Sequence, residues 1–229
     1  MPFEGIHIRC TGRADGDLGS LAERGPSGPG PALEARRREI VDRPWSWLRQ
    51  VHGARVVDVQ APGDHAGAEA DAAVSGAAGV ALAVLSADCA PIAFASPEGI
   101  IGVAHAGWRG VTGGVVAATV EMMRAKCATR IEASLGPCIH PACYEFSPSD
   151  LDDVAARLGD GVRAVTADGR PALDLPAAVR AAAAAAGAEV VAEETGCTAC
   201  DLDGAGAPRW FSHRARGDEG RQAVVVWTA

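Results

Sequence analysis

Apolar runs of strand length recur along the chain, separated by glycine, proline and polar residues. Ser96-Pro97-Glu98-Gly99 lies between two such runs and predicts the turn of a hairpin, because proline and glycine occupy turn-favouring places. A further stretch, 47–59, predicts a strand pair, or a strand and a turn, around Gly53. The other predicted strands cover residues 80–86, 91–95, 100–104, 131–135, 210–214 and 222–227.

Apolar residues at helical spacing, flanked by capping residues, predict the helices. Thr112 and Ser149 are placed to cap first turns, and Gly187 is placed to end a helix. The segment 16–31 is rich in glycine, proline and charge, which predicts a loop. The predicted helices cover residues 33–41, 112–125, 149–158 and 176–186.

Strands mixed with helices, including an antiparallel hairpin, predict an α/β or α+β domain with mixed sheets. With 229 residues and 48% hydrophobic content, the chain is long enough to bury one substantial core. We therefore expect a single domain over residues 1–229, with no internal repeat.

Charge and composition exclude several classes of function. A net charge of -8 opposes nucleic-acid binding, because phosphate backbones attract basic surfaces. No stretch reaches the roughly 18 apolar residues of a membrane span. Residues 1–10 lack the pattern of a secretory signal, so we expect a cytoplasmic protein. In that compartment, seven cysteines, an odd number, favour thiols or metal ligands over a disulfide framework.

Three metal-capable residues, His52, Cys89 and His105, each stand at the end of a predicted strand and beside small residues. Two imidazoles and one thiolate suit zinc, and three protein ligands leave a fourth position open for catalysis. The alternative is that each is a separate buried side chain. Asp88, next to Cys89, could orient a histidine or move a proton, although a solvated aspartate at a strand end fits equally well.

Two basic features indicate an anion. Gly107-Trp108-Arg109-Gly110 precedes a predicted helix and resembles a glycine-rich entry to an anion-binding N-terminus, so Arg109 is a candidate for phosphate. An ordinary tight turn with a surface arginine is the alternative. His213, Arg214 and Arg221 belong to the densest basic cluster of an acidic chain, which favours an anion clamp.

The remaining cysteines allow two interpretations. Cys197 and Cys200 have the C-x-x-C spacing of a zinc knuckle or a redox pair, and Cys138 with Cys143 could complete a four-thiolate zinc site. We favour the other interpretation, in which they are loop thiols near the rim of the pocket.

Short segments that include these candidate residues follow one another along the chain as they do in a known family. They resemble the YfiH-like, laccase-domain-containing family, whose members are labelled polyphenol oxidases and, more recently, purine nucleoside phosphorylases. The element Ala104-His105-Ala106-Gly107-Trp108-Arg109-Gly110 is highly specific to it. The other matching segments are Gln50-Val51-His52-Gly53, Asp71-Ala72, Ser86-Ala87-Asp88-Cys89, Gly136-Pro137-Cys138-Ile139, Cys143-Tyr144-Glu145, Phe211-Ser212-His213-Arg214 and Gly220-Arg221.

The resemblance implies a layered α/β/β/α domain with His52, Cys89 and His105 as metal ligands. It also implies phosphorolysis of adenosine, inosine, guanosine or methylthioadenosine, with adenosine deamination at the same site. The N-terminal region departs from the family, since the usual Gly-Gly-x-Ser and Ser-Leu-Asn-Leu segments are missing or reduced to residues 11–16.

Six histidines and no His-x-His pair exclude a conventional laccase, although copper at the His/Cys/His site could give weak oxidation. We predict zinc-dependent phosphorolysis, with phosphate held by Arg109, the turn after it and Arg221. Deamination is a side activity that needs a carboxylate such as Asp88 or Glu145.

Two other classes remain open. One is a cysteine hydrolase with Cys89 as nucleophile, and the other is a non-enzymatic zinc-binding module. For the enzyme we expect a purine nucleoside and phosphate as the only partners, and a monomer or homodimer.

Overall fold

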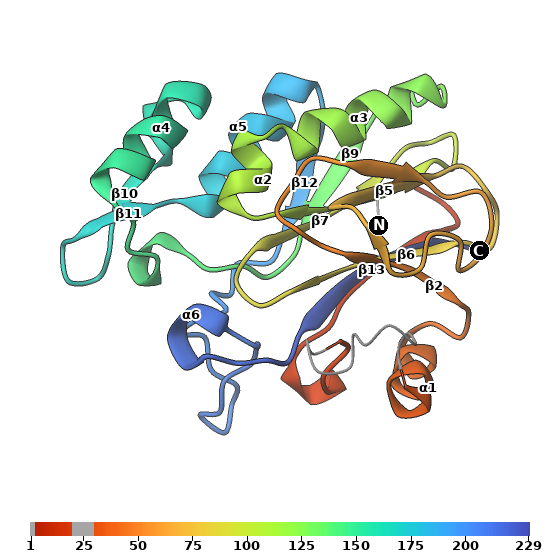
Figure 1. Ribbon diagram of the computed structural model, residues 1–229, viewed down its shortest axis with the longest axis horizontal. Coiled ribbons are helices and arrows are strands. Elements are labelled where there is room, and N and C mark those ends of the chain that lie inside the picture. The colour runs from red at the N-terminus through yellow and green to blue at the C-terminus, as the bar shows by residue number, and fades with distance from the viewer. Residues whose placement is uncertain (1–2, 20–29) are drawn as a thin grey trace.

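Two mixed β-sheets pack face to face, and helices cover the outer face of each (Figure 1). The structure is a computed structural model that describes residues 3–19 and 30–229. Most of the predicted loop at 16–31 lies outside the described residues. The order of layers is helices, six-stranded sheet, five-stranded sheet and helix, as the resemblance implies.

The six-stranded sheet has the order β12-β9-β7-β8-β5-β3. Its centre is the predicted hairpin, in which β7 and β8 pair antiparallel with Ile92 opposite Ala104. Apolar side chains of its outer face pack against four helices. The strands are β3 (Val56–Asp58), β5 (Ala72–Ser75), β7 (Ala90–Ala95), β8 (Ile101–Ala106), β9 (Glu132–Leu135) and β12 (Glu189–Glu193). The helices are α2 (Trp108–Thr112), α3 (Val115–Ala125), α4 (Pro148–Leu158) and α5 (Leu175–Ala186).

The five-stranded sheet has the order β1-β13-β6-β2-β4. Its outer face packs against α1, where the buried Arg37 guanidinium lies over the ring of Trp47. The strands are β1 (Ile6–Cys10), β2 (Trp45–Arg49), β4 (Ala68–Glu69), β6 (Ala81–Ser86) and β13 (Gln222–Thr228), and the helix is α1 (Pro31–Ile40). A separate ribbon joins β10 (Arg163–Val165) to β11 (Pro171–Leu173), and α6 (His213–Arg216) is a short helix.

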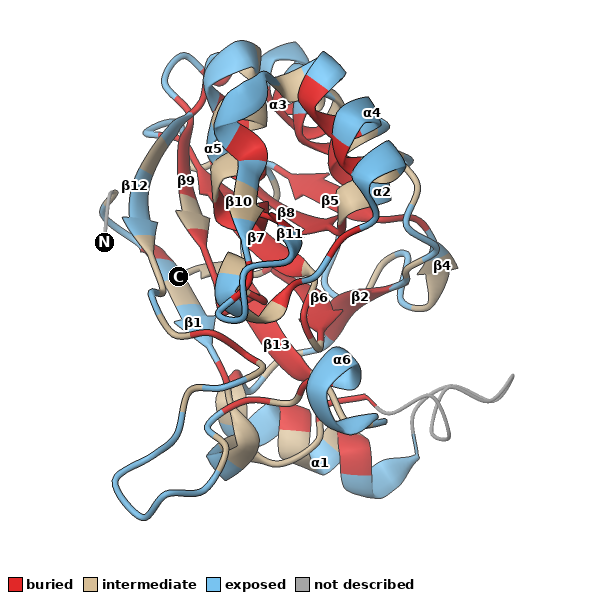
Figure 2. Cartoon of the chain, turned by 90° about the vertical axis from the view of Figure 1, so that its left-hand side faces the viewer, coloured by how far each residue is buried: buried red, intermediate tan, exposed pale blue. Residues whose placement is uncertain are grey.

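Strand β6 is buried on both faces. Leu82 and Val84 point into the core between the sheets, whereas Ala83 and Leu85 belong to the cluster under α1. A strand covered on both sides reads as a continuous apolar run, which is why 80–86 is so legible in the sequence. Figure 2 shows the buried residues concentrated in these central strands.

The predicted strands at 80–86, 91–95, 100–104, 131–135 and 222–227 are confirmed, and so are helices at 33–41 and 176–186. The strand at 210–214 is wrong, because Ser212 caps α6 by accepting a hydrogen bond from the Ala215 backbone. The 47–59 strands exist but belong to different sheets, so they are not a pair.

Two helix starts also differ from the prediction. Thr112 ends α2 instead of capping 112–125, since its hydroxyl bonds back to the Trp108 carbonyl. A new helix, α3, begins after Gly114, whose φ of 89° breaks the helical path. Helix α4 is capped by Ser147, two residues before the predicted Ser149, with Pro148 in its first turn. None of the described helices meets the length and hydropathy needed to cross a membrane.

Candidate active site

The fold brings His52 and Cys89 together through two loops that cross between the sheets. The β2–β3 loop carries His52 and the β6–β7 turn carries Cys89, and each leads from the five-stranded to the six-stranded sheet. Because β2 and β6 are parallel neighbours, both loops leave the same end of that sheet. His105 joins them from β8, since it pairs with Pro91 at the start of β7.

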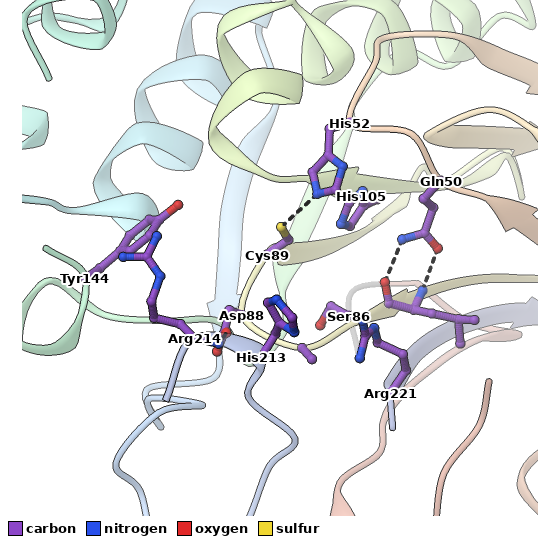
Figure 3. Close-up of a pocket in the computed structure, with 12 residues that line it drawn as sticks. Gln50, His52, Ser86, Asp88, Cys89, His105, Tyr144, His213, Arg214 and Arg221 are labelled. Carbon is purple, nitrogen blue, oxygen red and sulfur yellow. Dashed lines mark hydrogen bonds between the residues drawn. The ribbon is translucent and has the colours of Figure 1, made fainter. Parts of the chain in front are cut away.

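The three predicted ligands converge in space. Their candidate ligand atoms all lie within 4.8 Å of one another. The Cys89 Sγ is 3.7 Å from the His52 Nε2, and the two imidazole centroids are 4.9 Å apart (Figure 3). His52 is exposed, Cys89 half-buried and His105 buried. Solvent therefore reaches the cluster at His52, whereas His105 lies on its buried side.

Asp71 holds two of these ligands in place. Its buried carboxylate accepts hydrogen bonds from the backbone N–H groups of Val51, His52 and Gly53, at 3.1, 2.9 and 2.8 Å. It also lies 2.9 Å from the His105 Nδ1. A carboxylate at Nδ1 fixes the tautomer that presents Nε2 to a metal. The same contacts hold His52 in the left-handed conformation, with φ of 62°.

No role for Asp71 is predicted from the sequence beyond its place in the Asp71-Ala72 segment. A signal was available, because Asp71 is the only charged residue in the apolar run from Ala70 to Val74. A charge in such a run must find partners when the run is buried.

The electrostatics favour a charged Cys89 and His105 in the metal-free protein. Burial opposes the Cys89 thiolate, but His105 and His52 outweigh it and lower its pKa to about 6. Burial also opposes the His105 imidazolium, but the Cys89 thiolate and Asp71 raise its pKa to about 9. Burial likewise opposes the Asp71 carboxylate, but the hydrogen bonds that it accepts from His105 and the backbone outweigh burial and lower its pKa. Cys89 is thus poised as a thiolate, the form that binds metals.

Gly107 leaves the space that the ligands occupy. A Cβ at this position would lie 2.8 Å from the Cys89 Sγ and 3.0 Å from the His52 Cδ2. The glycine of the His105-Ala106-Gly107 element is therefore a steric requirement of the cluster.

Asp88 is tied into the wall of the site. One carboxylate oxygen accepts a hydrogen bond from the Thr198 hydroxyl at 2.7 Å, and the other from the Arg214 backbone N–H at 2.6 Å. Asp88 also has a positive φ of 102°. Asp88 is therefore buried, so the alternative of a solvated aspartate at a strand end is wrong, while the predicted proton transfer stays a prediction.

A cavity of about 360 Å³ opens in front of the cluster. His213, Arg214 and Arg221 lie across it from the ligands (Figure 3). The buried Ser86 hydroxyl has no hydrogen-bond partner among the described residues. The other lining residues are Gln50, His52, Leu85, Ala87, Asp88, Cys89, His105 and Tyr144.

Arg214 and Arg221, on this side of the cavity, keep N–H donors that have no partner among residues 3–19 and 30–229. Arg221 uses one terminal nitrogen for three carbonyls of the preceding loop, and Arg214 donates to the Glu145 carbonyl while its guanidinium lies over the Tyr144 ring. A guanidinium has five N–H donors, so both can still bind an anion.

Arg109 does not line this cavity. It borders a separate depression with Thr112 and Arg157, and its guanidinium lies over the Trp108 ring at 4.4 Å. The fold thus brings three of the four predicted anion-binding residues together and leaves Arg109 apart.

The four-thiolate arrangement is only partly present. Cys143, Cys197 and Cys200 form a second group within 4.8 Å, and Cys138 does not belong to it. None of the four lines the main cavity.

The His52, Cys89 and His105 donors fit a metal ion. Two imidazoles and a thiolate match zinc, and the cavity leaves a coordination position accessible. The same donors also accept copper. Among residues 3–19 and 30–229, this is the only group of candidate metal ligands that includes histidine, so nothing there resembles the trinuclear copper centre of a multicopper oxidase.

Comparisons with known proteins agree with this geometry. The family described as multi-copper polyphenol oxidoreductase laccase matches residues 32–229. A protein of Streptomyces coelicolor named purine nucleoside phosphorylase is 40% identical over 79% of this chain and 74% of its own length. A Streptomyces griseus protein with the same name is 36% identical over 96% of this chain and 91% of its own.

Solved structures share the fold. YlmD from Geobacillus stearothermophilus superposes with a TM-score of 0.78 at 30% identity, covering 99% of this chain and 93% of YlmD. A Neisseria meningitidis protein of the DUF152 family gives 0.76 at 28% identity, covering 98% and 95%. YfiH from Bacillus licheniformis gives 0.80 at 22% identity, covering 98% and 93%, which shows the fold alone.

Proposed function

We propose that this chain, which belongs to the family described as multi-copper polyphenol oxidoreductase laccase, is a metal-dependent purine nucleoside phosphorylase. Relatives that are 40% and 36% identical to it are named purine nucleoside phosphorylase. One observation carries the proposal. A single cavity has a His, Cys, His donor set on one side and a cationic wall on the other. That division suits a reaction between a nucleoside and an anion.

In phosphorolysis, a phosphate oxygen forms a bond to C1′ of the ribose while the bond from C1′ to the base breaks. The electron pair of that bond leaves with the purine, which must then take up a proton. Arg214, Arg221 and His213 would hold the phosphate and offset its charge. The Ser86 hydroxyl, which has no partner among the described residues, would hydrogen-bond the nucleoside, and the Tyr144 side chain would bound the cavity beside it.

We assign Zn²⁺ to His52, Cys89 and His105, with Cu²⁺ as the alternative ion. When bound, such an ion supplies Lewis-acid polarisation of a substrate group. Asp71 would orient His105 for this purpose, and Gly107 would keep the space clear.

The substrates we propose are adenosine, inosine, guanosine and methylthioadenosine. Adenosine deamination is ranked as a side activity, because it needs a carboxylate to shuttle protons. Asp88 is the only carboxylate that lines the described cavity, and both of its oxygens already accept hydrogen bonds. Glu145, the other candidate, pairs with Arg170 outside the cavity.

A nucleoside panel with and without inorganic phosphate tests the proposal. We expect free base and a ribose 1-phosphate from adenosine only when phosphate is present, and loss of this activity after chelation. Base release without phosphate would contradict phosphorolysis. Turnover that persists in chelator would instead favour Cys89 as the nucleophile of a hydrolase, and phenol oxidation without nucleoside turnover would favour the oxidase.

A further inference from the structure

Three cysteines outside the main cavity form a second cluster, which consists of Cys143, Cys197 and Cys200. Their Sγ atoms all lie within 4.8 Å of one another. Cys143 closes a 3-10 turn over Pro141–Cys143, and the other two lie in the loop between β12 and α6. Cys197 is buried, Cys143 half-buried and Cys200 exposed. Two distant segments thus bring three thiols to one point.

Backbone contacts hold this arrangement without a metal. Cys197 and Cys138 form a parallel β-bridge, and the Thr198 N–H donates to the Cys138 carbonyl at 3.0 Å. The His140 N–H lies 3.3 Å from the Cys197 Sγ, and the Cys143 N–H donates to the His140 carbonyl. Both segments are therefore fixed relative to each other.

The loop of this cluster also supports the active-site wall. Between Cys197 and Cys200, Thr198 donates its hydroxyl to Asp88, the residue before Cys89. Arg216 of α6 donates to the carbonyls of Thr198 and Ala199. Anything that fixes the cluster would therefore fix the loop that positions Asp88 and α6.

We propose that the second cluster binds a thiophilic metal ion, Zn²⁺, as a structural site separate from the catalytic one. Three sulfurs around one zinc, at about 2.3 Å each, lie about 3.8 Å apart in tetrahedral geometry, which small side-chain rotations can reach from the present arrangement. Binding displaces the three thiol protons and forms three zinc–sulfur bonds. The exposed side, next to a depression that Cys143 borders with Ala199, provides entry and the solvent ligand of the fourth position.

Metal stoichiometry tests the site independently of the proposed function. The parent is the full chain with His52→Ala and Cys89→Ala, which removes two ligands of the catalytic site. The protein is reduced, incubated with Zn²⁺, desalted and analysed for zinc per chain. We expect about one zinc in this parent. Adding Cys143→Ser and Cys200→Ser should remove it, whereas the matched pair Cys10→Ser and Cys127→Ser should keep it.

A second measurement distinguishes the loss of metal ligands from misfolding of the variants. With Co²⁺ in place of Zn²⁺, the parent should show a sulfur-to-cobalt charge-transfer band that the Cys143→Ser/Cys200→Ser variant lacks, while circular dichroism stays the same. The proposal would be overturned by a parent without zinc, or by equal zinc content in the two double-serine variants. The proposal would also be overturned if protein purified without reductant had a mass about 2 Da lower and its peptides contained a Cys197–Cys200 disulfide. The cluster would then rest as a disulfide and not as a zinc site.

Discussion

The two sides of the cavity are built differently. The metal ligands on one side lie at the ends of β2, β6 and β8. The buried Asp71 carboxylate holds this side in place through four hydrogen bonds. The basic wall stands on α6, a helix of four residues, and on the loop before β13. Its His213 and Arg214 side chains are exposed. The ligand side is thus held by a buried carboxylate at strand ends, whereas the wall presents exposed side chains from a short helix and a loop.

The largest effect should come from removing one of the metal ligands on the ligand side. Cys89→Ala deletes the only thiolate of the catalytic cluster, so two imidazoles remain to hold the ion. We expect zinc at this site to be lost and nucleoside turnover to fall below detection, with an unchanged circular dichroism spectrum. Metal analysis and the phosphate-dependent assay measure the two effects.

Cys127→Ser is the control, since it removes an exposed thiol that does not line the cavity. It should retain zinc and activity. Full activity in Cys89→Ala would refute both the ligand assignment and the hydrolase alternative.

The ligand side should also show an unusual pH dependence once its metal is removed. With a pKa of about 6, Cys89 is a thiolate at neutral pH, and this form is lost as the pH falls through about 6. At pH 7 its thiolate fraction should exceed that of an ordinary thiol, with a pKa of about 8.5, by roughly tenfold or more. Its rate of alkylation should rise accordingly. Peptide mass spectrometry after iodoacetamide treatment across pH gives the profile of Cys89 separately.

Replacing His105 by Gln provides the comparison for this profile. It removes the imidazolium that opposes the burial effect, so the midpoint of Cys89 alkylation should move to higher pH. A midpoint that does not move would show that His105 does not stabilise the thiolate.

The sequence predicts the ligand side better than the wall. His52, Cys89 and His105 could be chosen by residue type and by their places at strand ends, and the central strands by their apolar runs. Their convergence depends on β2 and β6 being parallel neighbours whose following loops cross to the other sheet. No local pattern encodes that pairing.

The wall depends on contacts that are still less local. The 210–214 segment has a strand-like composition, but Ser212 caps a helix there, and the Asp88 carboxylate binds the Arg214 backbone from a distant strand end. The glycine-rich turn before a predicted helix makes Arg109 a candidate for phosphate in the sequence. The fold instead starts the short α2 there and turns Arg109 onto Trp108.

A smaller effect is expected from Asp71→Asn. The amide has one acceptor oxygen, so it cannot serve the three backbone N–H groups and also accept from His105 as the carboxylate does. If its NH₂ group faces His105, the imidazole must present an N–H at Nε2, where the metal ion needs a lone pair. We expect a loss of metal affinity or activity of about 10–100-fold, measured by zinc titration and by kcat/KM.

The exposed Asp42 provides the control for this substitution, because Asp42→Asn makes the same chemical change on the surface. It should leave both quantities unchanged. Wild-type zinc affinity in Asp71→Asn would show that the hydrogen bond to His105 does not tune the site.

The smallest effect should separate two candidate phosphate residues, of which Arg221 belongs to the basic wall and Arg109 does not. Arg221 lines the cavity, whereas Arg109 borders another depression, so Arg221→Gln should raise the KM for phosphate about tenfold and change kcat little. That factor corresponds to one charge-assisted hydrogen bond of about 1.5 kcal/mol. Arg109→Gln should change the KM for phosphate less than about twofold, in the range of a surface substitution. Initial rates at varied phosphate and saturating nucleoside distinguish the variants. A larger loss with Arg109→Gln would place the phosphate at the start of α2, and the wall opposite the ligands would then need a different role.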